Sequence, residues 1–560
     1  MRVLLLAASS LGASSRRLLG VEFTSVPAAT CDVIPVSEGG WTVATGGAVR
    51  LTTVGDRPAA VDGDGWPTED AYLIPFIATP DAVDPLQFVP PSIWGDYHLS
   101  FSGKATIDLS PQINATLSAV VFDAATWTTT ATITLRPPVA GLGFGFFASQ
   151  RSAGTPLGSG VTHVRLLQPG AGAECTAFTP AVVAAVEPFE HARFMTWTLG
   201  DYIVGFSNAS EPGLGVAVEW TDRTQPTDAL WLPGYVRPKA FGAPWESVVL
   251  LTQAARVGAW INVPAQATDD YAAQLATLLR DGSASTGGAG VPEGLPIYIE
   301  HSNEVWLNGS AAALGGPSAA YLYNRAAAAA EVAANASSDL NIDGVNDAEI
   351  WGYRRHMRRV VEIGAIFARV FGADAARVRP VLGWMQNFQQ ELAGLTAWYE
   401  AALAASHGPI SSVLYGVAVN AYAVAGVSPG ASEADVVAGV VAASDAARSA
   451  RAASAALTAA AGLRLLTYEG SLVCIPFARD APTTSTIITA NRAAAWGAAM
   501  VHDYEMNWAS IPGTGEFNFF ALSSQYGEDA PAPRFQWGLT EDVANTTTAK
   551  FDAVRTLLGR

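Results

Sequence analysis

The strongest constraint on the fold is the regular alternation of two kinds of segment after about residue 160. Short apolar segments alternate there with Ala-rich stretches that favour helix. Such alternation predicts a parallel sheet whose strands are joined by helices. Eight strands within residues 161–560 predict a (β/α)8 TIM barrel with large insertions. The expected strands are 161–167, 193–197, 259–263, 297–303, 381–384, 413–419, 463–468 and 517–522.

The N-terminal part of the chain differs in amino-acid composition and in periodicity. Residues 21–160 are rich in Thr, Val, Gly and Pro and offer few helical stretches. Residues 127–135 alternate between apolar and polar with a period of two, as a strand with one buried face does. Further strands are expected at 97–101, 117–122 and 142–147. We therefore predict an antiparallel β-sandwich-like accessory domain over 21–160, which makes the whole chain an α/β protein with two domains.

The first twenty residues resemble a short secretory signal peptide. Met1-Arg2 is followed by a short apolar run and then by small residues. Five Asn-x-Ser/Thr sequons accompany it, and together they predict a secreted glycoprotein. The alternative, an ordinary N-terminus of a cytosolic protein, stays open because the apolar run is short. The sequons are Asn114, Asn208, Asn308, Asn335 and Asn545.

Composition excludes several classes of partner and cofactor. A net charge of −18 argues against nucleic acid and anionic membrane surfaces, which need basic patches. No segment after the N-terminus has the length of uninterrupted apolar residues that a membrane span requires. The seven His residues are scattered, so we expect no metal and no cofactor. Cys31, Cys175 and Cys474 leave room for one disulfide and one free thiol.

Two glutamates end expected strands of the barrel. Glu304 closes the fourth strand in the stretch Glu300-His-Ser-Asn-Glu304, and Glu469 closes the seventh before Gly470. Barrel enzymes carry their reacting groups at the C-terminal ends of strands. Two carboxylates facing each other there suit double-displacement glycoside hydrolysis, in which one attacks the anomeric carbon and the other transfers the protons.

The stretch Glu300-His-Ser-Asn-Glu-Val-Trp306 resembles a motif of clan A glycoside hydrolase-like (β/α)8 barrels. Segments 193–197, 220–223, 260–271 and 467–470 are similar to the same group, so the resemblance covers most of the chain in order. It implies a retaining hydrolase of a β-linked glycan, with an oligo- or polysaccharide substrate. Glu304 would be the acid/base and Glu469 the nucleophile.

The resemblance also implies a set of substrate-binding residues. Asn303 would bind the hydroxyl next to the anomeric carbon, and Tyr422 would donate a hydrogen bond to Glu469. Arg223 or Arg193 would lie near the nucleophile. Asn262 and His301 lie within the similar stretches and join the set. The candidate sugar-stacking residues are Trp197, Trp260, Trp306 and Trp537.

Purely structural roles for some of these residues, and other functions for the whole chain, stay open. Tryptophans are more often core residues than sugar platforms. Glu300 would lie below Glu304 as a buried carboxylate with Arg165 or Arg193 as its partner. Two functional alternatives also stay open: a non-catalytic carbohydrate-binding or cell-surface protein on the same fold, and a transglycosylase. The sequence predicts neither the sugar, nor the linkage, nor the oligomeric state.

Overall fold

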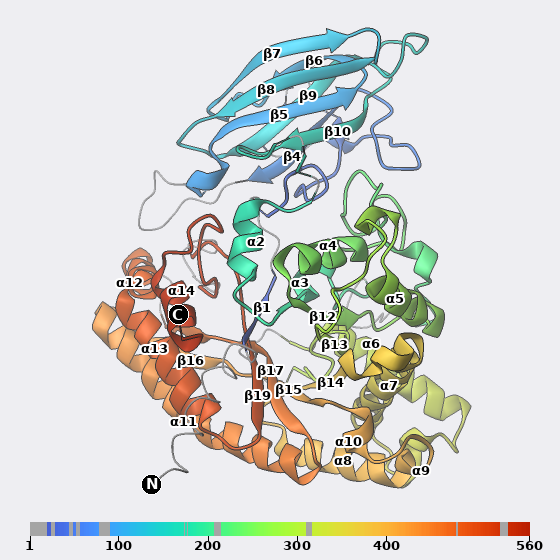
Figure 1. Cartoon of the computed structure of the whole chain (residues 1–560), viewed down its shortest axis with the longest axis vertical. Coiled ribbons are helices and arrows are strands. Elements are labelled where there is room, and N and C mark those ends of the chain that lie inside the picture. The colour runs from blue at the N-terminus through green and yellow to red at the C-terminus, as the bar shows by residue number, and fades with distance from the viewer. Residues whose placement is uncertain are drawn as a thin grey trace.

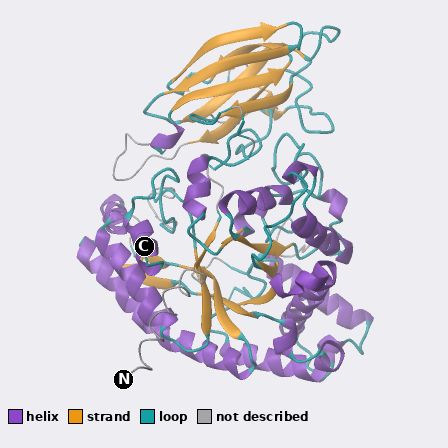
Figure 2. Cartoon of the chain, viewed as in Figure 1, coloured by secondary structure: helices purple, strands orange, loops and turns teal. Residues whose placement is uncertain are grey.

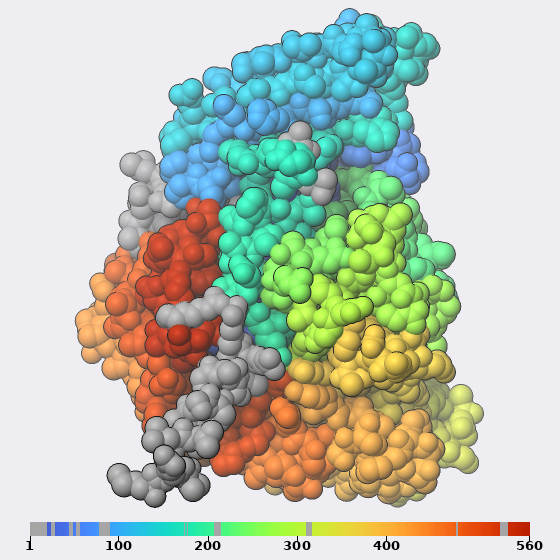
Figure 3. Space-filling view, viewed as in Figure 1, coloured from blue at the N-terminus to red at the C-terminus, as the bar shows by residue number. Residues whose placement is uncertain are grey.

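The computed structural model describes residues 19–23, 29–43, 49–51, 56–77, 90–172, 174–175, 177–206, 214–309, 316–477, 480–526 and 536–559. They form a (β/α)8 barrel and a β-sandwich that lies against it (Figure 1). In the space-filling view the sandwich is a separate lobe on top of the barrel (Figure 3). The fold class predicted from the sequence is therefore confirmed.

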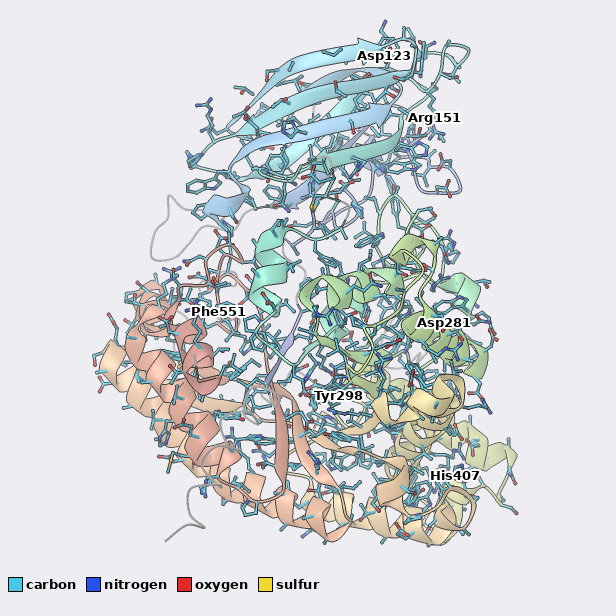
Figure 4. All side chains as sticks on the ribbon, viewed as in Figure 1. Asp123, Arg151, Asp281, Tyr298, His407 and Phe551 are labelled. Carbon is cyan, nitrogen blue, oxygen red and sulfur yellow. A yellow bond between two sulfur atoms is a disulfide. The ribbon has the colours of Figure 1, made fainter. Side chains whose placement is uncertain are left out.

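The barrel consists of eight parallel strands that close on themselves. Its strands are buried along nearly their whole length, as expected for a parallel sheet covered by helices. Tyr298, labelled in Figure 4, lies inside this barrel. In order, the strands are β1 (Leu19–Glu22), β11 (His191–Arg193), β12 (Gly258–Val263), β13 (Ile297–His301), β14 (Val378–Trp384), β15 (Gly416–Asn420), β17 (Arg464–Gly470) and β19 (Thr514–Phe519).

Helices surround these strands (Figure 2). Several begin where the sequence predicts: Thr268 and Ser432 each accept a hydrogen bond from a first-turn backbone N–H of their helix. The longer helices are α2 (Pro180–Val186), α4 (Trp245–Ala255), α5 (Asp269–Asp281), α6 (Ala319–Ala334), α7 (Ala348–Phe371), α8 (Gln389–Ala402), α11 (Glu433–Ala460), α12 (Ala481–Arg492), α13 (Ala494–Tyr504) and α14 (Ala549–Leu557).

The sandwich contains two antiparallel sheets. The four expected strands of residues 97–147 all form. One sheet has the order β10-β5-β8-β7 and the other β3-β2-β4-β9-β6. The strands are β2 (Thr42–Val43), β3 (Arg57–Pro58), β4 (Ala71–Ile77), β5 (Gly95–Ser102), β6 (Lys104–Leu109), β7 (Ala115–Asp123), β8 (Thr128–Leu135), β9 (Gly141–Gln150) and β10 (Thr162–Leu167).

The expected first barrel strand is wrong. Residues 161–167 do form a strand, β10, but it pairs antiparallel with β5 in the sandwich. The first barrel strand is β1, which pairs with β11 and β19. The physical reason is visible in burial: β1 is buried at all four positions, whereas β10 alternates and leaves Arg165 partly exposed.

The domain boundaries shift accordingly. The sandwich is an insertion between the first barrel strand and α2, so it extends to Leu167, and the barrel begins before it instead of at residue 161. The expected signal segment 1–20 overlaps β1 at Leu19 and Gly20, and its residues 1–18 lie outside the described residues.

A disulfide links the two chain segments that connect the barrel to the sandwich. Cys31 follows β1 and Cys175 precedes α2, with their Cα atoms 5.9 Å apart. The backbone around them is paired as well, because Val33 donates to Leu166 and Gln168 donates to Cys31. Cys474 is a buried free thiol.

Candidate active site

Glu304 is aimed by a sharp turn at the end of β13. Ser302 and Glu304 have φ values of +56° and +50°, in the left-handed region that non-glycine residues adopt rarely. Neighbouring groups hold this turn: the Asn262 amide donates to the Ser302 carbonyl at 2.6 Å, and the Ser318 hydroxyl donates to the Glu304 carbonyl at 2.9 Å. The surrounding structure thus fixes where the Glu304 carboxyl points.

Glu469 is positioned by an irregularity in β17. Thr467 pairs with Val419, but the next residue of β15, Asn420, pairs with Glu469, so Tyr468 is an extra residue. This is a β-bulge, and it lets two consecutive side chains reach the same site. The Tyr468 hydroxyl donates to Glu304 Oε1 at 3.2 Å, while Glu469 turns to Arg193 and Tyr422.

Arg193, at the end of β11, is the centre of the site. Its fully buried guanidinium donates to Glu469 Oε1 at 2.8 Å, to Glu22 Oε2 at 3.1 Å and to Glu300 Oε2 at 3.0 Å. It also donates to Asn303 Oδ1 at 2.8 Å. Four barrel strands therefore contribute to one network, because the C-terminal ends of β1, β11, β13 and β17 meet at one mouth.

The charges in this network do not balance. Three carboxyl groups share one guanidinium, and each of the four side chains is less than a tenth exposed. Burial raises the pKa of Glu22 to about 7, although Arg193 opposes the shift. Burial also raises the pKa of Glu300, against Arg193 and the Trp260 indole, which donates to it at 3.0 Å. Part of the negative charge is therefore neutralised by protons near neutral pH.

Arg193 itself stays charged. Burial acts to lower the pKa of this guanidinium, but the negative charges of Glu300, Glu22 and Glu469 raise it well above its usual range. Its guanidinium carbon also lies 5.0 Å from the centre of the Tyr468 ring. A fixed cation therefore lies beside the Glu469 carboxylate.

Glu304 lies in surroundings that differ from those of Glu469. Among the described residues, one side-chain hydrogen bond reaches the Glu304 carboxyl group, and it comes from Tyr468. Burial, followed by the negative charge of Glu469, raises the pKa of Glu304 to about 8. At neutral pH this carboxyl group holds a proton and can donate it.

Tyr422 holds the other oxygen of Glu469. Its hydroxyl donates to Glu469 Oε2 at 2.8 Å, as the resemblance to clan A barrels implied. The Tyr422 ring lies 6.3 Å from the rings of both Phe520 and Trp537, and these two rings are 5.1 Å apart. The three aromatic rings form an apolar wall beside the nucleophile candidate. Of the four predicted tryptophans, Trp537 is the one that lies at this wall.

The other three predicted tryptophans lie in the core. Trp197 packs against Phe23 and donates to Ser247, and it is 3% exposed. Trp260 is fully buried and stacks on Tyr298. Trp306 is fully buried as well. The prediction that they stack on a sugar is wrong for these side chains, because none offers a face to solvent.

Three more predicted substrate-binding residues have structural roles instead. Arg223 pairs with Glu246 at 2.8 Å and stacks on Trp220, so of the two candidate arginines it is Arg193 that contacts Glu469. His301 is buried against His356, with Nδ1 atoms 3.0 Å apart. Asn262 is fully buried and supports the Ser302 turn.

Two residues of the site, Glu22 and Tyr468, were not predicted from the sequence. Glu22 was assigned to the front domain, although its flanking run Leu18 to Phe23 is as apolar as a barrel strand. Tyr468 precedes Glu469 and would point away from it in a regular strand, so only the bulge brings both into the mouth. Of the two partners expected for Glu300, Arg193 is the one that binds it, at 3.0 Å, whereas Arg165 in β10 pairs with Asp32.

Neither a metal centre nor a membrane span is found in the described part of the chain. Among these residues, no three or more His, Cys, Asp or Glu side chains are arranged to hold a metal ion. None of the described helices is long and apolar enough to cross a bilayer.

The fold and the site thus define an eight-stranded barrel with two glutamates of contrasting environment at its mouth. No family model and no curated protein matches the chain. Among solved structures it is similar to a GH51 arabinofuranosidase from Xanthomonas axonopodis pv. citri, with 12% identity and a TM-score of 0.36. That match covers 62% of this chain and 60% of the arabinofuranosidase.

Two structures that contain GH10 modules are also similar. One holds the CBM22-1–GH10 modules of endo-1,4-β-D-xylanase 10B from Clostridium thermocellum with xylohexaose, at 10% identity and a TM-score of 0.32, covering 95% of this chain and 97% of that one. The other is a GH10 protein from Paenibacillus barcinonensis, at 10% identity and a TM-score of 0.32, covering 68% and 91%. The chemistry proposed below rests on this chain's own residues.

Proposed function

We propose that this protein is a retaining glycoside hydrolase that cleaves a β-linked glycan by double displacement. The supporting observation is the contrast between the two glutamates. Glu469 receives hydrogen bonds from the Arg193 guanidinium and the Tyr422 hydroxyl, whereas burial raises the pKa of Glu304 to about 8. A carboxyl group that keeps its proton, facing a second carboxyl group bound to a cation, is typical of an acid and a nucleophile that act together.

In the first step a Glu469 oxygen attacks the anomeric carbon. The bond to the leaving oxygen breaks, and Glu304 gives that oxygen its proton. In the second step the Glu304 carboxylate takes a proton from water, the water oxygen attacks the same carbon, and Glu469 is released. Arg193 and Tyr422 stabilise the negative charge that returns to Glu469.

Asn303 is suited to bind the sugar beside the reacting carbon. Its Oδ1 atom accepts a hydrogen bond from Arg193 at 2.8 Å, which fixes the orientation of the amide. The amide NH2 group is then the half left to donate to a substrate hydroxyl. A donor placed there binds the glycan through the hydroxyl next to the anomeric carbon.

The test compares Glu469→Gln and Glu304→Gln on a panel of polysaccharides and on aryl glycosides. We expect Glu469→Gln to lower kcat by more than about 10³ on every substrate. Glu304→Gln should do so on natural glycans but lose much less with an aryl leaving group, which needs no proton to depart. Circular dichroism controls for folding. Full activity of either variant would rule out the assignment.

We also propose that the protein is secreted and glycosylated. The Cys31–Cys175 disulfide supports an oxidising compartment, and the sequon residues Asn114, Asn335 and Asn545 are exposed. Expression in a eukaryotic secretory host should give a product whose mass falls after treatment with an N-glycanase. An unchanged mass would contradict glycosylation, and retention of the protein inside the cells would contradict secretion.

A further inference from the structure

The sixth and seventh barrel strands continue beyond the barrel. After a short break β15 is followed by β16 (Ala423–Val427), and β17 is followed by β18 (Leu472–Pro476). Across the break Ala421 donates to the Glu469 carbonyl and Ala423 donates to the Ser471 carbonyl. The pairing keeps one register from Asn420 with Glu469 to Val427 with Pro476. The strands thus form one parallel ribbon that starts at the nucleophile candidate.

The two faces of this ribbon differ. Helix α11 packs against both β16 and β18. Figure 1 shows α11 in the outer ring of helices. The side chains on that face are buried, among them Ala423, Ala425, Leu472 and Cys474. Because side chains alternate along a strand, the opposite face begins with Tyr422 and Glu469. That face, the inner face, is turned away from α11.

The inner face is apolar and exposed. Val424 is 49% exposed, Ile475 44% and Phe477 73%. Apart from Glu469, residues 422–427 and 469–477 include no charged side chain. Exposed apolar residues gathered on one face, continuous with a candidate active site, indicate a binding surface.

Phe477 and Gly426 fit each other on this face. A Cβ atom added to Gly426 would lie 2.1 Å from the Phe477 ring, so the ring lies directly over the glycine backbone. Glycine is therefore the residue that lets the ring lie across the ribbon. An aromatic ring that lies over a glycine and is open to solvent is suited to stack on the apolar face of a sugar.

We propose that Val424, Ile475 and Phe477 form a secondary binding surface for the glycan chain that is cleaved at Glu469. This inference rests on the proposed function and deepens it. Phe477 is eight residues beyond Glu469, which is about 26 Å along a strand at roughly 3.3 Å per residue. A ligand that touches both must be an oligomer or polymer of several sugar units. The uncharged surface favours a neutral glycan over an acidic one.

The experiment uses Phe477→Ala in the full chain, with Leu157→Ala as the matched control. Leu157 is a similarly exposed apolar residue, 72%, but it belongs to the sandwich. For Phe477→Ala we expect the ratio of kcat/KM on the polysaccharide to kcat/KM on a short aryl glycoside to fall between about twofold and tenfold, mainly through KM. Gly426→Ala should lower the same ratio by displacing the ring. Leu157→Ala should leave it unchanged.

Binding to the Glu469→Gln protein separates this inference from the proposed function. Affinity electrophoresis in a gel that contains the neutral polysaccharide should show retardation that Phe477→Ala weakens, whether or not turnover occurs. An unchanged ratio together with unchanged retardation would overturn the inference while leaving the catalytic assignment intact. Two other outcomes would also overturn it. In one, Phe477→Ala abolishes a concentration-dependent dimerisation but leaves glycan binding intact. In the other, it abolishes binding to phosphatidylcholine vesicles but leaves glycan binding intact.

Discussion

The ends of the fourth and seventh barrel strands carry the same residue type in opposite settings. Glu469, after β17, contacts a buried cation and a phenol hydroxyl. Glu304, after β13, has one hydrogen bond from Tyr468 and lies near the negative charge of Glu469. The two carboxyl groups therefore have different electrostatic surroundings, although both belong to the mouth of one barrel.

The difference teaches that role is set by neighbours from other strands. Glu469 depends on Arg193 from β11 and Tyr422 from the end of β15. Glu304 depends on Tyr468, which reaches it only through the bulge in β17. Changing these neighbours, and not the glutamates, is the way to reduce or sharpen the contrast.

The largest effect is expected for Arg193→Met. This change leaves Glu22, Glu300 and Glu469 buried without their shared cation. Breaking a buried ion pair by removing one partner costs about 3–5 kcal/mol, so urea denaturation should show a loss of that size in the free energy of unfolding. The kcat of the folded fraction should fall by at least about 10² because Glu469 loses its strongest donor.

Arg165→Met is the control for that experiment. Arg165 was the other partner that the sequence suggested for Glu300, but its side chain is 44% exposed and lies 3.5 Å from Asp32. Exposed pairs contribute about 0–1 kcal/mol. If the two variants proved equally stable and active, Arg193 would not be the centre of the site.

Much of the fold could be predicted because its signals are local. Apolar strands and Ala-rich helices alternate, and caps such as Thr268 and Ser432 mark where helices start. The first strand was missed because β1 has only four residues and is separated from β11 by the whole sandwich. A short apolar run at the front of a chain gives no local sign of which sheet it will join.

The site was predictable in part for the same reason. Strand-end position and motif identified Glu304, Glu469 and Asn303, and the likeness to known barrels suggested Tyr422. The sequence could not show that Trp260 and Trp306 would be buried, since burial depends on contacts between distant strands. Nor could it place Tyr468, because the bulge that turns it inward is a property of strand pairing.

A smaller effect is expected for Tyr422→Phe. The aromatic ring at position 422 keeps its packing against Phe520 and Trp537, but Glu469 loses the hydrogen bond from the hydroxyl. Because Arg193 still binds the other oxygen, we expect kcat to fall by roughly 10- to 100-fold, with little change in stability. Steady-state kinetics on the best polysaccharide would measure this. Tyr399→Phe, which removes a hydroxyl bonded to the Gly408 carbonyl in the outer ring, should leave kcat unchanged.

The smallest effect concerns the pH dependence of Glu304. The proposed first step needs this carboxyl group protonated, so kcat/KM should decline as the pH rises through about 8. The Tyr468 hydroxyl stabilises the charged form of Glu304 and so lowers its pKa, against the larger effects of burial and Glu469. Tyr468→Phe should therefore move the basic limb of the profile to higher pH while changing kcat at its plateau by less than about tenfold. A basic limb that moved to lower pH, or that did not move at all, would mean that another group, and not Glu304, supplies the proton to the leaving oxygen.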